Sequence, residues 1–255
     1  MRLVVILGLL LAVTACERGT ASALAPTPLA EPPHTAMPRA KVVLVAAEGS
    51  IKAFDNAVAR FAKDLTNRAG IAATDIQRFS ANPSPDSMLS DVDAVMRVIG
   101  TLQAAPGQAC LVFMTGHGMR NNGIVFPRSK DYLDAKQLDR VLTLGCGAQP
   151  TVVIMSACYS GLYANRRVAR DNRIIITATN RDRPSFGCGA QNEFTFFDGC
   201  FLTAFEDPRG RTWEDVAAMA MACVADLERA DDYVPSRPLL MVGKSVAGLP
   251  VPTAR

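Results

Sequence analysis

The sequence predicts an α/β fold in which a mostly parallel sheet is covered by helices on both faces. Four runs of consecutive apolar residues are typical of strands that are buried on both faces of a sheet: residues 41–47, 109–114, 151–155 and 173–178. Segments with apolar residues at helical spacing alternate with these runs, which is the pattern of a parallel sheet with covering helices. Hydrophobic residues make up 49% of the 255 residues, which is enough to bury a core and excludes wholesale disorder.

Further helices and short strands are expected between and after the buried strands. Helices are predicted where apolar residues recur every three or four positions; Gly70 marks the end of the first helix, and Thr212 is placed to cap the last one. A Gly-, Asp- and Arg-rich stretch, residues 179–193, is expected to be a loop. In chain order the other expected elements are a helix at 53–69, a short strand at 75–79, a helix at 86–103, an extended piece at 123–126, helices at 135–144, 194–205 and 213–229, and a last strand at 239–242.

The N-terminal residues are expected to lie outside the folded domain. Residues 1–16 read MRLVVILGLLLAVTAC, in which one Arg precedes an apolar run too short to span a bilayer, as in a secretory signal. Because the end of this run resembles the bacterial lipobox, we expect residues 1–15 to be a lipoprotein signal peptide and Cys16 to be lipidated. The alternatives are an ordinary cleaved signal or an N-terminal membrane anchor, with Cys16 incidental.

The rest of the chain is then divided into a tether, a domain and a tail. Residues 16–40 are rich in Pro and Ala and are expected to form a flexible tether from the lipid to the domain. The domain is expected at residues 41–245, followed by a C-terminal tail at 246–255. This arrangement predicts a lipid-anchored protein at the periplasmic face of a bacterial membrane, and Glu17 after the lipidated cysteine favours the outer membrane.

Charge, histidine and cysteine content limit the classes of function. Lys plus Arg number 27 against 24 for Asp plus Glu, so the net charge of +3 gives no support to nucleic-acid binding. One of the two histidines, His34, lies in the tether, which leaves His117 as the single imidazole of the domain. No paired CxxC spacing is present, so we expect neither a zinc site nor another metal or cofactor.

Six cysteines remain after Cys16, in a compartment that permits disulfides. Their pairing does not follow from the sequence. If one of the six is a catalytic thiol, five remain, and at least one more is free. They are Cys110, Cys146, Cys158, Cys188, Cys200 and Cys223.

Residues suited to acyl-transfer chemistry follow two of the buried strands, where ligands bind in folds of this class. Thr115-Gly116-His117-Gly118 follows the second buried strand, and Ser156-Ala157-Cys158 lies at the end of the third. A thiol needs a neighbouring base or cation to become a thiolate, and adjacent strand ends bring His117 and Cys158 together across 41 positions. The alternatives are a histidine in a turn and a buried structural cysteine.

The order of strand–TGHG and strand–SACYSG resembles the legumain-like cysteine peptidases, which share the caspase-type fold, and in particular their bacterial lipoprotein branch. The resemblance spans roughly residues 41–243. The other matching stretches are Gly49-Ser50, Phe54-Asp55-Asn56-Ala57, residues 175–188, Phe194-Thr195-Phe196-Phe197 and Pro235-Ser236-Arg237-Pro238.

This resemblance implies a caspase-like three-layer sandwich and a cysteine endopeptidase that acts on protein or peptide substrates. Cys158 is then the nucleophile and His117 the general base and acid, while the backbone N–H groups of Gly118 and Cys158 form the oxyanion hole. The reaction passes through a thioester acyl-enzyme. Its acyl group goes to water, or to an amine as in the relatives that are transpeptidases.

The specificity pocket departs from the pattern of legumains that cleave after asparagine. Those enzymes have a glutamate two residues before the nucleophile, where this chain has Ser156, and a second acid after a glycine, where this chain has Asp198-Gly199 in the opposite order. Ser156 and Asp198 remain candidate pocket residues, although Asp198 is equally well explained as a helix N-terminal residue. Glu48 and Ser50 are candidates to orient His117 or line the site, with loop residues facing water as the alternative.

Two functions from different classes remain. The first is the lipid-anchored cysteine endopeptidase, and the second is a catalytically inactive relative that serves as a periplasmic binding or scaffold module, which the altered pocket favours. An α/β-hydrolase is excluded because its order is nucleophile, acid, histidine, whereas His117 precedes Cys158. Ser160, in the turn after Cys158, is expected to be a structural hydroxyl rather than a rival nucleophile.

Overall fold

The computed structural model describes residues 39–252. The predicted signal peptide at 1–15, the lipidation site Cys16 and the tether up to residue 38 lie outside the described residues. Within residues 39–252, none of the helices has the length and apolar character needed to cross a membrane.

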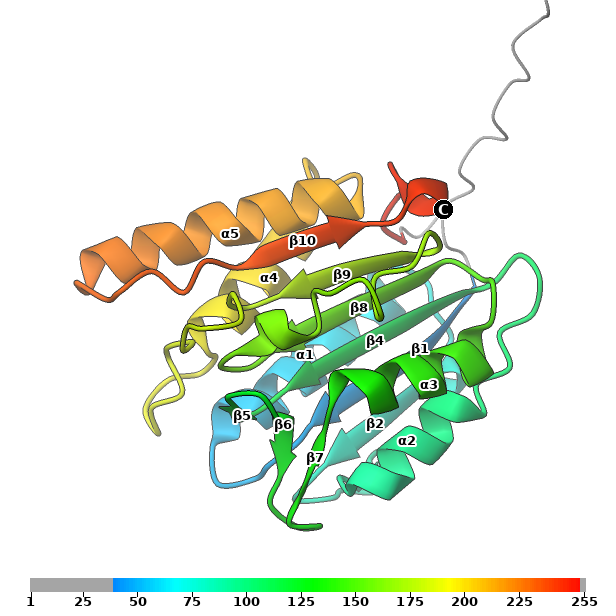
Figure 1. Cartoon of the computed structure of the whole chain (residues 1–255), viewed down its shortest axis with the longest axis horizontal. Coiled ribbons are helices and arrows are strands. Elements are labelled where there is room, and N and C mark those ends of the chain that lie inside the picture. The colour runs from blue at the N-terminus through cyan, green and yellow to red at the C-terminus, as the bar shows by residue number, and fades with distance from the viewer. Residues whose placement is uncertain (1–38, 253–255) are drawn as a thin grey trace, which may run out of the picture. The chain divides into compact units, whose positions relative to one another are not determined.

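A seven-stranded sheet forms the middle layer of the fold (Figure 1). Its strand order is β10-β9-β8-β4-β1-β2-β3, and every neighbouring pair is parallel except β9 with β10. The four predicted buried strands are β1, β4, β8 and β9, which lie side by side in the sheet. The strands are β1 (Ala40–Ala46), β2 (Ile76–Ser80), β3 (Met88–Leu89), β4 (Ala109–Thr115), β8 (Thr151–Ser156), β9 (Arg173–Thr177) and β10 (Leu239–Val242).

Helices cover both faces of this sheet and create two separate cores (Figure 1). On β1, Val42 and Leu44 point into one core while Val43 and Val45 point into the other, which explains why the strand is apolar at every position. The predicted α/β fold with a mostly parallel sheet between helices is therefore confirmed. The helices on the first face are α1 (Lys52–Asn67), α4 (Phe196–Glu206) and α5 (Trp213–Ala230), and those on the second are α2 (Val92–Gly100) and α3 (Ala135–Cys146).

The helix predicted at 86–103 is wrong at its N-terminal end. Met88 and Leu89 instead form the short strand β3, which pairs with β2. The helix α2 begins only at Val92, because the Asp91 carboxylate accepts hydrogen bonds from the backbone N–H groups of Asp93 at 3.0 Å and Ala94 at 3.1 Å. Apolar spacing alone does not separate a short edge strand from the helix that follows it.

Smaller elements complete the fold. A second, three-stranded antiparallel sheet follows β4, and the helical turns η1, η2 and η3 are each one turn of 3₁₀ helix. Val246, Leu249 and Val251 lie beyond the predicted domain end at 245, yet all three are buried. The elements are β5 (Gly118–Met119), β6 (Gly123–Phe126), β7 (Asp131–Leu133), η1 (Ala73–Asp75), η2 (Ser160–Leu162) and η3 (Lys244–Val246).

Two disulfides join neighbouring elements, one on each side of the sheet. Cys110 of β4 pairs with Cys146 of α3, and Cys200 of α4 pairs with Cys223 of α5. Among the described cysteines, Cys158 and Cys188 are free, as expected for a chain in which one thiol is reserved for chemistry and at least one more is unpaired.

Each disulfide is expected to contribute about 3–4 kcal/mol to the free energy of unfolding, because the bonds close loops with sequence separations of 36 and 23 residues. Urea unfolding of the double variants Cys110→Ala/Cys146→Ala and Cys200→Ala/Cys223→Ala measures this directly. A loss below about 1 kcal/mol in either variant would mean that the bond constrains the unfolded chain far less than its loop length predicts.

Candidate active site

The two predicted site motifs leave the sheet side by side. β4 and β8 are neighbouring parallel strands, with Met114 opposite Met155 and Thr115 opposite Ser156. Beyond them the backbone N–H of Gly116 still donates to the Ser156 carbonyl at 3.1 Å. The expectation that neighbouring strand ends hold the TGHG and SAC motifs is confirmed.

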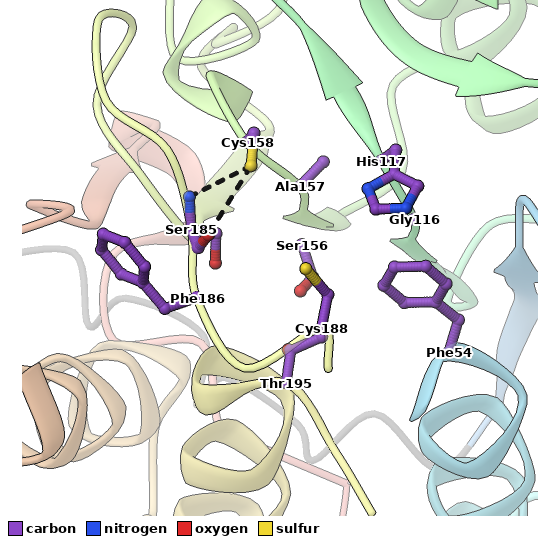
Figure 2. Close-up of a pocket in the computed structure, with 10 residues that line it drawn as sticks. All are labelled: Phe54, Gly116, His117, Ser156, Ala157, Cys158, Ser185, Phe186, Cys188 and Thr195. Atoms are coloured by element: carbon purple, nitrogen blue, oxygen red, sulfur yellow. Dashed lines mark hydrogen bonds between the residues drawn. The ribbon is translucent and has the colours of Figure 1, made fainter. Parts of the chain in front are cut away.

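One pocket contains both His117 and Cys158 (Figure 2). The His117 ring meets Phe54 edge to face, with ring centroids 5.5 Å apart and an interplanar angle of 86°. In Figure 2 the Cys158 sulfur is turned toward Ser185 rather than toward the imidazole. The pocket is lined by Phe54, Gly116, His117, Ser156, Ala157, Cys158, Ser185, Phe186, Cys188 and Thr195.

The Cys158 thiol is held by the backbone of Ser185. The Ser185 N–H donates to the sulfur at 3.2 Å, and the Ser185 carbonyl oxygen lies 3.7 Å from it as an acceptor. Burial raises the pKa of the Cys158 thiol; the Ser185 N–H acts in the opposite direction, and Cys188 raises the pKa further. The sulfur is therefore a protonated thiol near neutral pH in this state and needs a base before it acts as a nucleophile.

His117 stands between two glycines that no larger residue can replace without movement. A Cβ at Gly116 would lie 2.8 Å from the Ala47 Cβ, and one at Gly118 would lie 1.9 Å from the Cys158 carbonyl oxygen. Gly118 thus packs directly against the backbone of Cys158, and the two predicted oxyanion-hole residues are neighbours. The His117 carbonyl accepts from the Val125 N–H at 2.8 Å, which ties the motif to β6.

The turn after Cys158 is strained and firmly held. Tyr159 has a φ of +58°, a left-handed conformation that is uncommon for a residue with a large side chain. Its N–H donates to the Arg183 carbonyl at 2.9 Å, and the Arg120 guanidinium lies 4.9 Å from its ring centroid. Ser160 is buried and its hydroxyl accepts from the Thr179 N–H at 3.2 Å, which is the structural use expected for it.

Of the four candidate pocket residues, Ser156 lines the pocket and Asp198 lies buried nearby without lining it. Asp198 is in the first turn of α4, where its N–H donates to the Thr195 hydroxyl at 3.0 Å. Its Oδ2 accepts from the Thr115 hydroxyl at 2.7 Å, and its Oδ1 has no hydrogen-bond partner among the described residues. The interpretation of Asp198 as a helix N-terminal residue is confirmed, whereas its side chain bonds to the end of β4 and does not line the pocket.

Glu48 and Ser50 bond to each other instead of lining the pocket. The Ser50 hydroxyl donates to both carboxylate oxygens of Glu48 at 2.9 Å, and the Ile51 N–H donates to Glu48 Oε1 at 3.0 Å. The pair closes the turn that leads into α1. Within residues 39–252, the pocket that holds His117 and Cys158 includes neither of them.

Several pocket residues were not predicted from the sequence. Phe54 comes from α1, Thr195 caps α4, and the loop after β9 supplies Ser185, Phe186 and Cys188. The loop has no apolar periodicity, so its sequence does not indicate which side chains enter the pocket.

Among the described residues, no group of three or more His, Cys, Asp or Glu side chains is arranged to hold a metal ion.

The buried Asp198 carboxyl is expected to make stability depend on pH. Burial raises its pKa from 3.8 to about 6, against the lowering effect of the Ser156, Thr115 and Thr195 hydroxyls. The folded chain therefore holds this proton more tightly than the unfolded chain. The contribution of Asp198 to the free energy of unfolding is therefore expected to fall as the pH rises from about 4 to 6, by about 3 kcal/mol for a shift of about two units.

The variant Asp198→Asn is the matched test, because the amide is uncharged at every pH. Its stability is expected to equal that of the parent chain near pH 4 and to exceed it at pH 7, as measured by urea unfolding at the two pH values. An advantage of the same size at both pH values would contradict the raised pKa.

Comparison with known proteins agrees with these features. The sequence model of the Peptidase C13 family matches residues 87–214, half of the chain, and this stretch includes both His117 and Cys158. The fold is similar to that of a solved structure, the crystal structure of caspase-1 from Spodoptera frugiperda, with a TM-score of 0.56 and 14% identity over 81% of this chain and 87% of that chain. At this identity the likeness shows the fold alone. No curated protein matches the chain significantly.

The family match and the caspase-type fold confirm the resemblance to legumain-like peptidases and support a cysteine peptidase, whose substrates are proteins or peptides. The chain belongs to the Peptidase C13 family.

Proposed function

We propose that the protein is a cysteine endopeptidase in which Cys158 is the nucleophile and His117 the general base and acid. The observation that carries this proposal is that one pocket, at the ends of neighbouring strands in a C13-family chain, contains both side chains. The Cys158 thiol is free, whereas four other described cysteines form disulfides. Its raised pKa makes a neighbouring base necessary, and His117 is the imidazole that lines the same pocket.

The reaction follows from these groups. On substrate binding the Cys158 sulfur leaves Ser185, gives its proton to His117 and attacks the scissile carbonyl carbon. The backbone N–H groups of Gly118 and Cys158 stabilise the oxyanion. The C–N bond then breaks, His117 protonates the leaving amine, and a thioester remains. Water attacks the thioester with His117 as base; an amine in the place of water gives transpeptidation.

The pocket beside Cys158 has a volume of about 10 Å³, so we propose that it receives a very small substrate side chain, which precedes the scissile bond. Its walls are the rings of Phe54 and Phe186 together with small hydroxyl-bearing residues, and no Asp, Glu, Lys or Arg lines it. A charged side chain would lose its hydration there without gaining a partner. Peptides with Asp, Glu, Lys or Arg before the scissile bond are therefore expected to react at least about a hundredfold more slowly than those with small neutral residues.

A peptide library varied at this position tests the function and the pocket together. Turnover of the neutral members by the purified chain, and its complete loss in Cys158→Ala, is the expected result. Equal rates for charged and neutral members would contradict the pocket assignment, and turnover that survives in Cys158→Ala would contradict the nucleophile.

The second candidate function is an inactive binding or scaffold module. Two observations favour it. The pocket lacks the acidic residues of asparagine-cleaving legumains, and the Cys158 sulfur is hydrogen-bonded to the Ser185 backbone. It predicts that no member of the library is cleaved by the reduced chain, although peptides still bind.

We also propose that Cys16 is lipidated and anchors the protein at the periplasmic face of a bacterial outer membrane. The support is the signal-like run with a small residue before Cys16, and Glu17 after it. Incorporation of a labelled fatty acid in cells, lost in Cys16→Ser, is the expected result. Labelling that persists in Cys16→Ser would contradict the anchor.

A further inference from the structure

Two free thiols, rather than one, line the candidate active site. Cys158 and Cys188 both belong to the pocket, and they are the free cysteines among the described residues. Figure 2 shows the Cys188 side chain extending from its loop into this pocket, toward Ser156. The nucleophile assigned above therefore has a second sulfur in its immediate surroundings.

One short stretch of the loop both contacts Cys158 and carries Cys188. At its start the Ser185 backbone contacts the Cys158 sulfur through both its N–H and its carbonyl group. Three residues later Cys188 enters the pocket. Cys188 also raises the pKa of the Cys158 thiol.

The position of Cys188 is fixed by the turn before it. Gly187 has a φ of +87°, and a Cβ there would lie 2.6 Å from the Phe196 nitrogen, so glycine is required. The Phe196 N–H donates to the Phe186 carbonyl at 3.1 Å, and the Asn192 side-chain amide donates to the Gly187 carbonyl at 2.9 Å. These contacts hold the loop against the start of α4 with Cys188 facing the site.

The chain already forms disulfides elsewhere. Cys110–Cys146 and Cys200–Cys223 are typical of a protein that folds where thiols become oxidised. In such surroundings a nucleophilic thiol without a partner is exposed to stepwise oxidation, whose later steps are irreversible. A second thiol at the same site reacts with the first oxidation product of the nucleophile and gives a disulfide, which is reversible.

We propose that Cys188 is the resolving thiol of a reversible modification site, at which a small-molecule disulfide oxidises Cys158 and Cys188 to an internal disulfide. Formation of the bond does not require peptide cleavage. Its consequence, reversible loss of peptidase activity, rests on the function proposed above.

The exchange balances in two steps. The Cys158 thiol gives its proton to His117, and its sulfur attacks the small disulfide, whose S–S bond breaks with release of one small thiolate, leaving a mixed disulfide on Cys158. The Cys188 sulfur, having lost its proton, then attacks the Cys158 sulfur and expels the second small thiolate. Two electrons pass from the two cysteines to the small disulfide, which becomes two thiols after protonation.

Disulfide mapping tests the proposal on the purified chain. The chain is incubated with oxidised glutathione, remaining thiols are alkylated, and the digest is analysed without reduction. A peptide pair linked through Cys158 and Cys188 is expected in monomeric protein, beside the two native pairs, which report that the fold is intact. Labelling of Cys158 by a thiol-directed peptide electrophile is expected to fall at least about tenfold and to return with dithiothreitol.

The variants Cys188→Ser and Cys188→Ala separate the resolving step from the first attack. In both, Cys158 is expected to keep a bound glutathione, because no second thiol expels it. A parent chain that also keeps glutathione on Cys158 and yields no Cys158–Cys188 peptide would overturn the proposal. Mapping does not depend on peptide turnover, so a chain that forms the linked pair but cleaves nothing even after reduction would contradict the proposed function and still support the disulfide.

Discussion

Replacing His117 by alanine is expected to lower kcat/KM for peptide cleavage by about a thousandfold at neutral pH, within the range typical of a lost general base. Burial raises the pKa of the Cys158 thiol, so the sulfur stays protonated without a base. Among the residues that line the pocket, no carboxylate or second imidazole takes over the role. The fold is expected to persist, because the His117 ring is only partly buried and its one ring contact is with Phe54.

The pH profile separates a base from a merely structural residue. As the pH rises toward the pKa of the thiol, the His117→Ala variant is expected to recover part of its rate, because the thiolate then forms without help. The same measurement on the parent chain provides the reference. A variant that matches the parent at neutral pH, or whose residual rate does not rise with pH, would remove His117 from the mechanism.

Replacing Gly118 by alanine is expected to reduce kcat/KM by at least about a hundredfold, comparable with the loss of an oxyanion-hole donor. The new Cβ would lie 1.9 Å from the Cys158 carbonyl oxygen and 3.2 Å from the Ala157 Cβ. The TGHG and SAC segments must therefore separate, which displaces both the Gly118 N–H and the backbone of Cys158. Because the carbonyl oxygen that the new Cβ would overlap belongs to the Cys158 backbone, no side-chain rotation relieves the overlap.

Gly100→Ala is the matched control. Gly100 is also a glycine without a positive φ, but an added Cβ would have Val141 as its nearest neighbour at 4.0 Å, an ordinary contact. This variant is expected to keep full activity. If Gly118→Ala keeps the parent rate, the close approach of the two motifs has no catalytic importance; thermal melting and the two native disulfides check that both variants are folded.

The sheet was predictable because buried parallel strands have a direct sequence signal. The continuous apolar runs at 109–114 and 151–155 gave two strands of nearly the observed length, and parallel pairing then fixed which residues leave the sheet together. The same logic brought His117 and Cys158 to one edge. The role of Thr212 as the N-terminal cap of α5 was also predicted, and its hydroxyl accepts from the Asp215 N–H at 3.1 Å.

The rest of the site was not predictable because it depends on contacts without periodicity. The loop at 179–193 sends Ser185 and Cys188 into the pocket only through the turn at Gly187 and its bonds to the start of α4. Asp198 is turned toward Thr115 by the helix that carries it, which neither its charge nor its neighbours in sequence indicate. The short strand β3 was hidden within an apolar pattern that continues into α2.

The central claim is that Cys158, and not Cys188, is the nucleophile that His117 activates. The most direct measurement is peptide mapping of the reduced chain after reaction with a thiol-directed peptide electrophile at neutral pH. A single label on Cys158, formed much more slowly in His117→Ala, is the predicted result. A label carried by Cys188, or a Cys158 label that forms equally fast without His117, would contradict the account.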